Sequence, residues 1–408
     1  MTAPSSRKFD DPAREAAGLL IRLGVAVLAI GVPCGAVVSR RVIFSVMPVG
    51  AVLILLGVAL DPRRANLSAL RDSVLSPMGL TALFLLGWAG LSLIWTPFAG
   101  VATERFVKTA GTALLAAAAA ASLPAHTKTS NLYLLPVGLA AAALASFAVA
   151  MLIPVAPMID LETSTIDRAS LTLIMLMWPA LAALAVRERW ASAGALAVAV
   201  AIAAITVWTP IALAALALGA ITFSLATSAP KRVGATLGVV LGGLILIAPV
   251  LPLALAPVLR SGTSQFASSM QVAAQIVNAE GVRLVTGHGF DTALRSVSIN
   301  YLPAATPRSA LFEIWYELGV VGALAAALLV FLAFRAAGSA SRSAAPFLLS
   351  TLVCGFAIAL SGLVTAQLWW LTLLTVVGVQ FAIVVKGQYR TERPSAQVFS
   401  AGSPQPQS

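Results

Sequence analysis

The sequence predicts an all-α, polytopic membrane protein with about twelve transmembrane helices and one large extramembrane loop. Of its 408 residues, 59% are hydrophobic and only 10% are charged, whereas a soluble domain carries about 25% charged residues. Apolar runs that could cross a bilayer recur along the chain, since a spanning helix needs about 20 such residues. No polar stretch is long enough to form a separate soluble core. We therefore expect a single bundle covered mostly by lipid.

The N-terminal segment, residues 1–16, is polar and precedes the first apolar run, 17–38. Basic residues before an apolar run also occur in signal peptides. However, a signal peptide has an apolar region of about 7–15 residues and a small-residue cleavage site. The run here is longer and lacks an obvious site of that kind. We expect a retained first helix preceded by a cytoplasmic segment.

Further apolar runs of similar length follow the first one. They cover residues 42–60, 78–96, 106–123, 133–153, 169–186, 191–208, 211–227, 235–256, 310–334, 345–364 and 368–385. The predicted bundle extends over residues 17–393. The Pro- and Ser-rich tail, residues 394–408, has the composition of a disordered cytoplasmic segment.

The basic residues predict the orientation of the bundle. The net charge of +11 is therefore interpreted as topology and not as nucleic-acid binding, because Lys and Arg accumulate in cytoplasmic loops. With the N-terminus inside, sixteen Lys and Arg residues fall on the inner side and nine on the outer side. Both termini are thus expected in the cytoplasm.

Two connections are longer than the others, and both fall on the outer face. One covers residues 154–168, and the other extends over about residues 257–309 with a helix-like middle at 265–280. Long ordered loops are often functional. The second loop also contains the Gly-rich turn from Gly287 to Phe290.

The cysteines and histidines predict no metal site and no cofactor. Cys34 and Cys354 both lie inside apolar runs and are expected to be buried small side chains. With two histidines and no Cys/His cluster, the ligands of a structural zinc site are missing.

Several basic residues lie on the outer side against the general charge bias. They are Arg105, Lys108, Arg168, Arg260, Arg295 and Arg308. They could simply contact lipid headgroups or reflect an imperfect bias. Arg168 and Arg308, however, stand where a helix enters the membrane, and arginine there is costly unless it has a partner or a task. Because guanidinium holds phosphate in a bidentate manner, a lipid pyrophosphate is a fitting ligand.

Two further side chains are candidates for acid–base chemistry. His288 is the only histidine on the predicted outer side, and histidine titrates near neutral pH. It could equally be an exposed loop residue without a task. Glu317 lies four residues after Glu313 on the helix that starts near Ala310. The helix dipole explains an acid at Glu313 better than one at Glu317, which leaves a functional or hydrogen-bonding role for Glu317.

Several short motifs, in this order, resemble one protein family. They are Trp95-Thr96-Pro97 with Arg105, Asp167-Arg168 with Trp178-Pro179, Gly287-His288-Gly289-Phe290, the run from Pro307 to Gly319, and Trp369-Trp370. Together they resemble the O-antigen ligase and O-antigen polymerase superfamily. Each motif alone is weak, but their order and the single large loop make the resemblance fairly specific.

This resemblance implies a metal-independent glycosyltransferase in the bacterial inner membrane. It would move a glycan from an undecaprenyl-pyrophosphate carrier to lipid A core or another glycan acceptor at the periplasmic face. Arg168 and Arg308, with Arg260 and Arg295, would bind the pyrophosphate, and the loop histidine would be the base.

One position departs from the family pattern. The family motif Pro-His-Asn is Pro307-Arg308-Ser309 here, so the usual base is replaced by an arginine. Either His288 or a carboxylate such as Glu317 substitutes, or the chemistry differs, or the activity is lost. A second interpretation is a membrane transporter or lipid-handling protein without transferase activity.

Overall fold

The structure is a computed structural model, and it describes residues 12–61, 67–124, 129–152, 165–259, 262, 264–279, 283–362 and 368–387. Within these ranges the chain is built almost entirely from helices, which confirms the predicted all-α class. Residues 1–11, most of the predicted loop 154–168, Arg260 and the predicted tail lie outside the described residues.

The helices of the bundle follow one another along most of the chain. They are α1 (Pro12–Ala26), the π-helical turn η1 (Val27–Gly31), α2 (Val32–Val38), α3 (Arg40–Leu60), α4 (Leu67–Leu75), α5 (Pro77–Leu91), η3 (Ser92–Ile94), α6 (Ala99–Ser122), η4 (Thr129–Tyr133), α7 (Leu134–Leu152), α8 (Thr165–Val186), α9 (Trp190–Val207), α10 (Pro210–Ser228), α11 (Pro230–Ile247), α16 (Ala310–Gly338), α17 (Ala345–Leu360) and α18 (Leu368–Val385). Four shorter helices lie between α11 and α16, and we call this part of the chain the cap. They are α12 (Val250–Leu255), α13 (Gln265–Ala279), α14 (Arg283–Thr286) and α15 (Thr292–Ser298).

In the described part of the chain, ten helices are long and apolar enough to cross a membrane. Ten of the twelve predicted runs correspond to these helices. The other two runs form α6 and α17. Helix α17 has 16 residues, and α6 has 24 residues but includes Glu104, Arg105 and Lys108 near its start. The protein is thus a polytopic helical membrane protein.

The predicted helix over residues 235–256 was wrong at both ends. Helix α11 starts earlier, at Pro230, and stops at Ile247, and the short α12 follows from Val250. Pro249 and Pro252 cause this break, because proline supplies no N–H to the helical hydrogen-bond ladder.

Helix α8 forms the centre of the bundle, since 94% of its most apolar stretch is buried inside the protein. The indole N–H of Trp178 donates to Cys354 Sγ at 3.2 Å, and that thiol donates to the Ala215 carbonyl at 3.0 Å. These contacts join α8, α17 and α10. Cys354 is therefore buried as predicted, while Cys34 is only half-buried.

Helices α11 and α16 approach each other closely along a row of glycines. Gly234, Gly238 and Gly242 recur at every fourth position of α11. A Cβ atom at these three positions would lie 2.6–3.1 Å from a backbone oxygen of α16. Small residues at this spacing allow two membrane helices to pack backbone against backbone. The row therefore fixes α16, which carries the candidate site.

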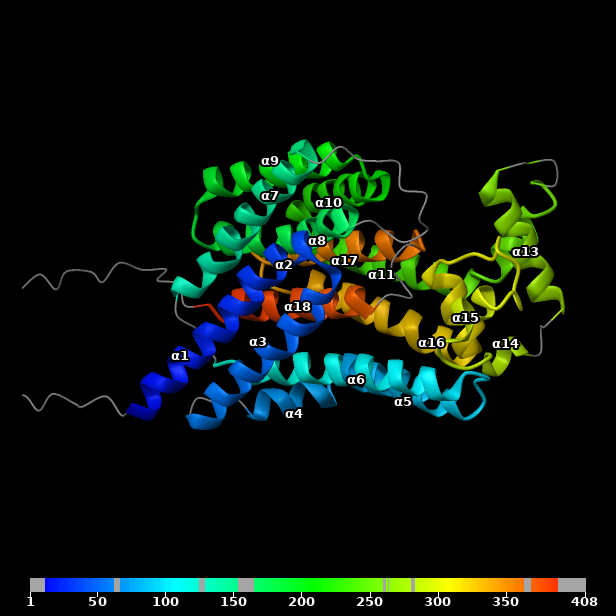
Figure 1. The fold of residues 1–408 in the computed structure, drawn as a ribbon, viewed down its shortest axis with the longest axis horizontal. Helices are drawn as coiled ribbons and strands as arrows, with labels where there is room; N and C mark the ends of the chain where they lie inside the picture. The colour runs from blue at the N-terminus through cyan, green and yellow to red at the C-terminus, as the bar shows by residue number, and fades with distance from the viewer. Residues whose placement is uncertain are drawn as a thin grey trace, which may run out of the picture.

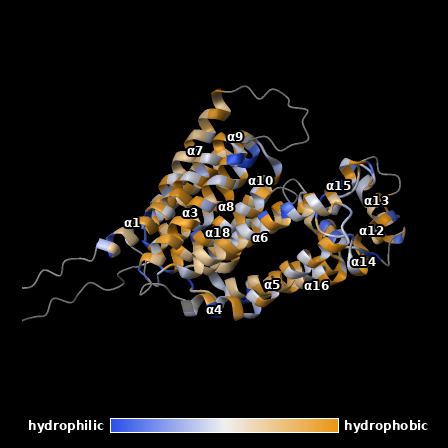
Figure 2. Cartoon of the chain, turned by 60° about the horizontal axis from the view of Figure 1, so that its bottom comes forward, coloured by the Kyte–Doolittle hydropathy of each residue, from blue (hydrophilic) through white to orange (hydrophobic). Residues whose placement is uncertain are grey.

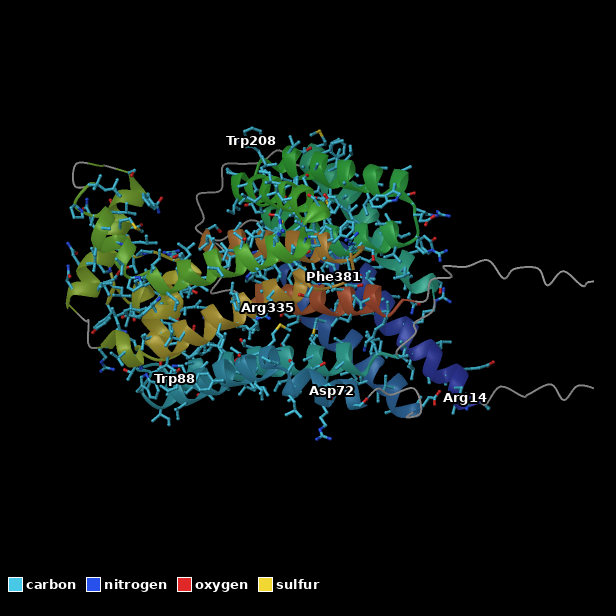
Figure 3. All side chains as sticks on the ribbon, turned by 180° about the vertical axis from the view of Figure 1, so that it is seen from behind. Arg14, Asp72, Trp88, Trp208, Arg335 and Phe381 are labelled. Atoms are coloured by element: carbon cyan, nitrogen blue, oxygen red, sulfur yellow. The ribbon has the colours of Figure 1, made fainter. Side chains whose placement is uncertain are left out.

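The cap and the two ends of the described chain lie at opposite ends of the molecule (Figure 1). In Figure 3, Arg14 of α1 lies at one end of the molecule, and Trp88 of α5 lies towards the other. Apolar residues cover the helices of the bundle, and hydrophilic residues gather among the cap helices (Figure 2). The predicted helix-like middle of the long loop is present as α13.

Candidate functional site

Helix α16 is interrupted at Gly319, close to the cap. Gly319 has φ 65° and ψ −162°, so α16 is two helical pieces joined at this residue. This conformation is essentially limited to glycine. The interruption frees the backbone carbonyls that precede it, because their usual N–H partners four residues later are displaced.

Other parts of the chain satisfy these carbonyls. The N–H of His288 donates to the Tyr316 carbonyl at 2.8 Å, and the N–H of Gly289 donates to the Glu317 carbonyl at 2.9 Å. The indole N–H of Trp88 donates to the Leu318 carbonyl at 2.8 Å. The Gly-rich turn of the cap is thus docked onto the break in α16.

The glycines of this turn are required by the close approach of the two backbones. Gly287 and Gly289 have φ of 76° and 100°. A Cβ atom at Gly287 would lie 2.3 Å from the Glu317 carbonyl oxygen, and one at Gly289 would lie 2.7 Å from Thr96. Any larger residue at these two positions would push the turn away from α16 or from the loop before α6.

His288 is held by its backbone and also by its ring. The Nδ1 atom lies 3.0 Å from the Tyr316 carbonyl oxygen. Because a carbonyl only accepts, Nδ1 carries the proton, and Nε2 is the acceptor nitrogen of the neutral ring. The imidazole also stacks on the Tyr316 ring, with centroids 4.0 Å apart and planes 8° apart. This fixed tautomer suits a general base that acts through Nε2.

Glu317 has a clear hydrogen-bonding role. Its Oε1 accepts from the backbone N–H of Ala293 at 3.1 Å, in the first turn of α15. A carboxylate at this place satisfies a free N–H and complements the positive end of the helix. A catalytic role for Glu317 stays a prediction.

Arg295 forms an ion pair within the protein. It contacts the carboxylate of Asp291, as does Arg105 of α6, and the Asp291 side chain is only 1% exposed. Two guanidinium groups thus share one buried carboxylate. The contacts fasten α15 to α6, and they compete with any phosphate that Arg295 would bind.

Arg168 and Arg308 lie in different surroundings. Arg168, near the start of α8, is 5% exposed, and its neighbour Asp167 accepts from the Thr209 hydroxyl at 2.6 Å. Arg308 is exposed just before α16, with Gly362 packed against its backbone. Arg260 lies outside the described residues.

Arg308 lines an apolar cavity of about 340 Å³ between the cap and the ends of α16 and α17. The walls are mostly apolar side chains, including Leu251, Phe266, Phe312 and Trp315. Three serines, Ser269, Ser309 and Ser361, also line the cavity. Such a cavity fits an apolar chain with a charged group at Arg308.

A larger cavity of about 870 Å³ contains His288. Its lining residues are Trp95, Pro97, Phe98, Asn278, Ala279, Arg283, His288, Thr292, Ser296, Ile299, Tyr301 and Tyr316. Among the described arginines predicted to bind pyrophosphate, Arg168, Arg295 and Arg308 do not line this cavity. Among the described residues, Arg283 is the arginine that lines this cavity, and the sequence did not single it out. Tyr316 lines both cavities, so the two lie next to each other.

Among the described residues, no group of three His, Cys, Asp or Glu side chains lies close enough together to bind a metal ion.

Comparison with known proteins does not assign the chain to a family: no protein family, curated protein or solved structure matches it. The likeness to the O-antigen ligase and polymerase superfamily therefore rests on the motifs alone.

Proposed function

We propose that this protein is a metal-independent glycosyltransferase of the O-antigen ligase and polymerase type. It would move a glycan from an undecaprenyl-pyrophosphate carrier to lipid A core or another glycan. The observation that supports this most is the pair of adjacent cavities at the cap. One is apolar with Arg308 at its wall, and the other holds His288 among aromatic and polar side chains.

The two cavities fit the two halves of such a reaction. The apolar cavity suits part of a polyprenyl chain, and Arg308 would hold the attached pyrophosphate. The acceptor hydroxyl would approach from the cavity of His288. The oxygen of the acceptor hydroxyl forms a bond to the anomeric carbon of the donor sugar, while the bond from that carbon to the pyrophosphate oxygen breaks. The hydroxyl proton passes to Nε2 of His288, and the carrier leaves as its pyrophosphate.

His288 takes the place of the missing family base in this scheme. Arg308 occupies the family histidine position and cannot accept a proton, since arginine stays charged in proteins. His288 has a fixed tautomer and lies in the larger cavity, 3.0 Å from a carbonyl that orients its ring. Arg168 is a second candidate for the pyrophosphate.

The proposed location is the bacterial inner membrane, with both termini in the cytoplasm and the cap in the periplasm. The excess of Lys and Arg on the side of the N-terminus supports this orientation. The separation of the cap from the ends of the described chain fits the same arrangement (Figure 1).

A transporter or lipid-handling protein is the alternative, and one observation favours it. Transporters often contain broken helices whose free carbonyls bind ions near the middle of the membrane, and α16 is broken at Gly319. Here, however, protein N–H groups already bind the carbonyls of Tyr316, Glu317 and Leu318, and the break lies beside the cap. This arrangement supports a docking role for the break.

A gene deletion tests the proposal. Loss of a transferase should leave the carrier-linked glycan accumulated in the inner membrane and the surface glycan unligated or unpolymerised, and wild-type protein should restore transfer. Long glycan that stays on the carrier would indicate a ligase, and single repeat units on the surface would indicate a polymerase. Unchanged surface glycan would contradict the proposal.

A further inference from the structure

We propose that the larger cavity binds an acidic saccharide, and that Arg283 holds the carboxylate of one sugar ring. This inference rests on the proposed function in one respect, namely that the ligand is a glycan. It adds the chemical class of that glycan and a specificity-determining residue on α14.

The first argument is the charge of the cavity wall. Its lining residues, as far as the chain is described, include one arginine and one histidine but no aspartate or glutamate. An anion that enters therefore meets a cation, and no carboxylate among the described lining residues. The Arg283 side chain is exposed and forms no ion pair with a described residue. In this respect Arg283 differs from Arg105 and Arg295, which both form an ion pair with Asp291.

The second argument is the shape and chemistry of the remaining wall. The rings of Trp95 and Phe98 are partly exposed and that of Tyr301 is 67% exposed, so all three are accessible. The negative faces of such rings attract the weakly positive C–H groups of a sugar. Asn278 adds a donor and an acceptor for hydroxyl groups. The volume of about 870 Å³ lies within the range of about 300–1,000 Å³ for ligand sites.

The third argument separates a carboxylate from a pyrophosphate. A pyrophosphate ester carries at least two negative charges, and the described wall offers one permanent cation, Arg283. A sugar carboxylate carries one charge and matches the bidentate fork of one guanidinium. The apolar cavity beside Arg308 is the better place for a carrier pyrophosphate.

Calorimetric titration of the full-length protein in detergent tests this inference. The probes are trigalacturonate, the neutral galactotriose of the same linkage, and inorganic pyrophosphate. We expect trigalacturonate to bind at least tenfold more tightly than galactotriose. Arg283→Gln should remove this difference, while Arg283→Lys should keep part of it. Arg335→Gln is the matched control, since Arg335 is exposed at the far end of α16.

Three results would overturn the inference. They are equal affinity for the acidic and neutral trisaccharides, binding of neither one, and an acidic preference that survives Arg283→Gln. Binding of pyrophosphate alone, lost in Arg283→Gln, would assign Arg283 to the carrier and also contradict it. The proposed function can fail separately: if the acidic preference is present but gene deletion leaves surface glycan unchanged, the saccharide site stands without the transferase.

Discussion

The indole N–H of Trp88 donates a 2.8 Å hydrogen bond to the carbonyl of Leu318, directly before the break in α16. This bond joins α5 to the same part of α16 on which the Gly-rich turn is docked. The Trp88 ring also lies 5.8 Å from that of Trp95, which lines the cavity of His288. The position of the candidate base is thus coupled to a helix of the membrane bundle.

Removal of this hydrogen bond should loosen the docked turn. We expect Trp88→Phe to cost about 0.5–1.5 kcal/mol, the usual net value of one hydrogen bond. Hydrogen exchange followed by mass spectrometry should show faster exchange in peptides covering residues 283–292. Trp190→Phe is the control, because Trp190 is exposed and lies at the start of α9. Equal exchange in the two variants would disprove the coupling.

The break in α16 should require glycine. At Gly319 a Cβ atom would lie 2.5 Å from the Val285 carbonyl oxygen, and the backbone has φ 65°. We expect Gly319→Ala to destabilise the protein by about 1–3 kcal/mol and to lower its Tm. Gly243→Ala on α11, where a Cβ atom meets nothing within 4 Å, should be neutral or slightly stabilising. The prediction fails if both substitutions change Tm equally.

The topology can be tested with two engineered cysteines. Ser298 in the cap and Ser341 between α16 and α17 are both exposed. A cysteine at Ser298 should react with an impermeant thiol reagent in intact spheroplasts, and one at Ser341 should react only after lysis. The wild-type protein, with Cys354 buried and Cys34 half-buried, gives the background. Labelling of Ser341→Cys in intact cells would invert the proposed orientation.

Arg308 should matter for transfer and little for folding. It is exposed beside the apolar cavity, so Arg308→Ala should abolish glycan transfer without lowering expression. Arg308→Lys should rescue transfer poorly, because lysine lacks the bidentate fork. Arg335→Ala, at the other end of α16, should transfer normally. Near-normal transfer by Arg308→Ala would leave this arginine without a role in substrate binding.

The helices were predictable and the docking of the cap was not. Apolar runs mark membrane helices well because lipid demands length and hydrophobicity together. The break at Gly319 lies inside a run that is long and mostly apolar, so neither length nor hydrophobicity reveals it. The partner of Arg295 could have been found from Asp291, four residues before it, because that spacing favours ion pairs. The role of Arg283 could not be predicted from the sequence, since its place in the cavity depends on how the cap folds onto Tyr316.

The most direct test of the central claim is the rate of glycan transfer by His288→Ala, measured with carrier-linked glycan and acceptor. Loss of a general base typically costs about 10²–10⁴ in rate, and we expect a decrease in this range. His288→Gln should do no better, since an amide cannot accept the proton, and His126→Ala, which changes the other histidine, should transfer normally. A decrease of less than about tenfold in His288→Ala, or no transfer by the wild-type protein, would contradict the account.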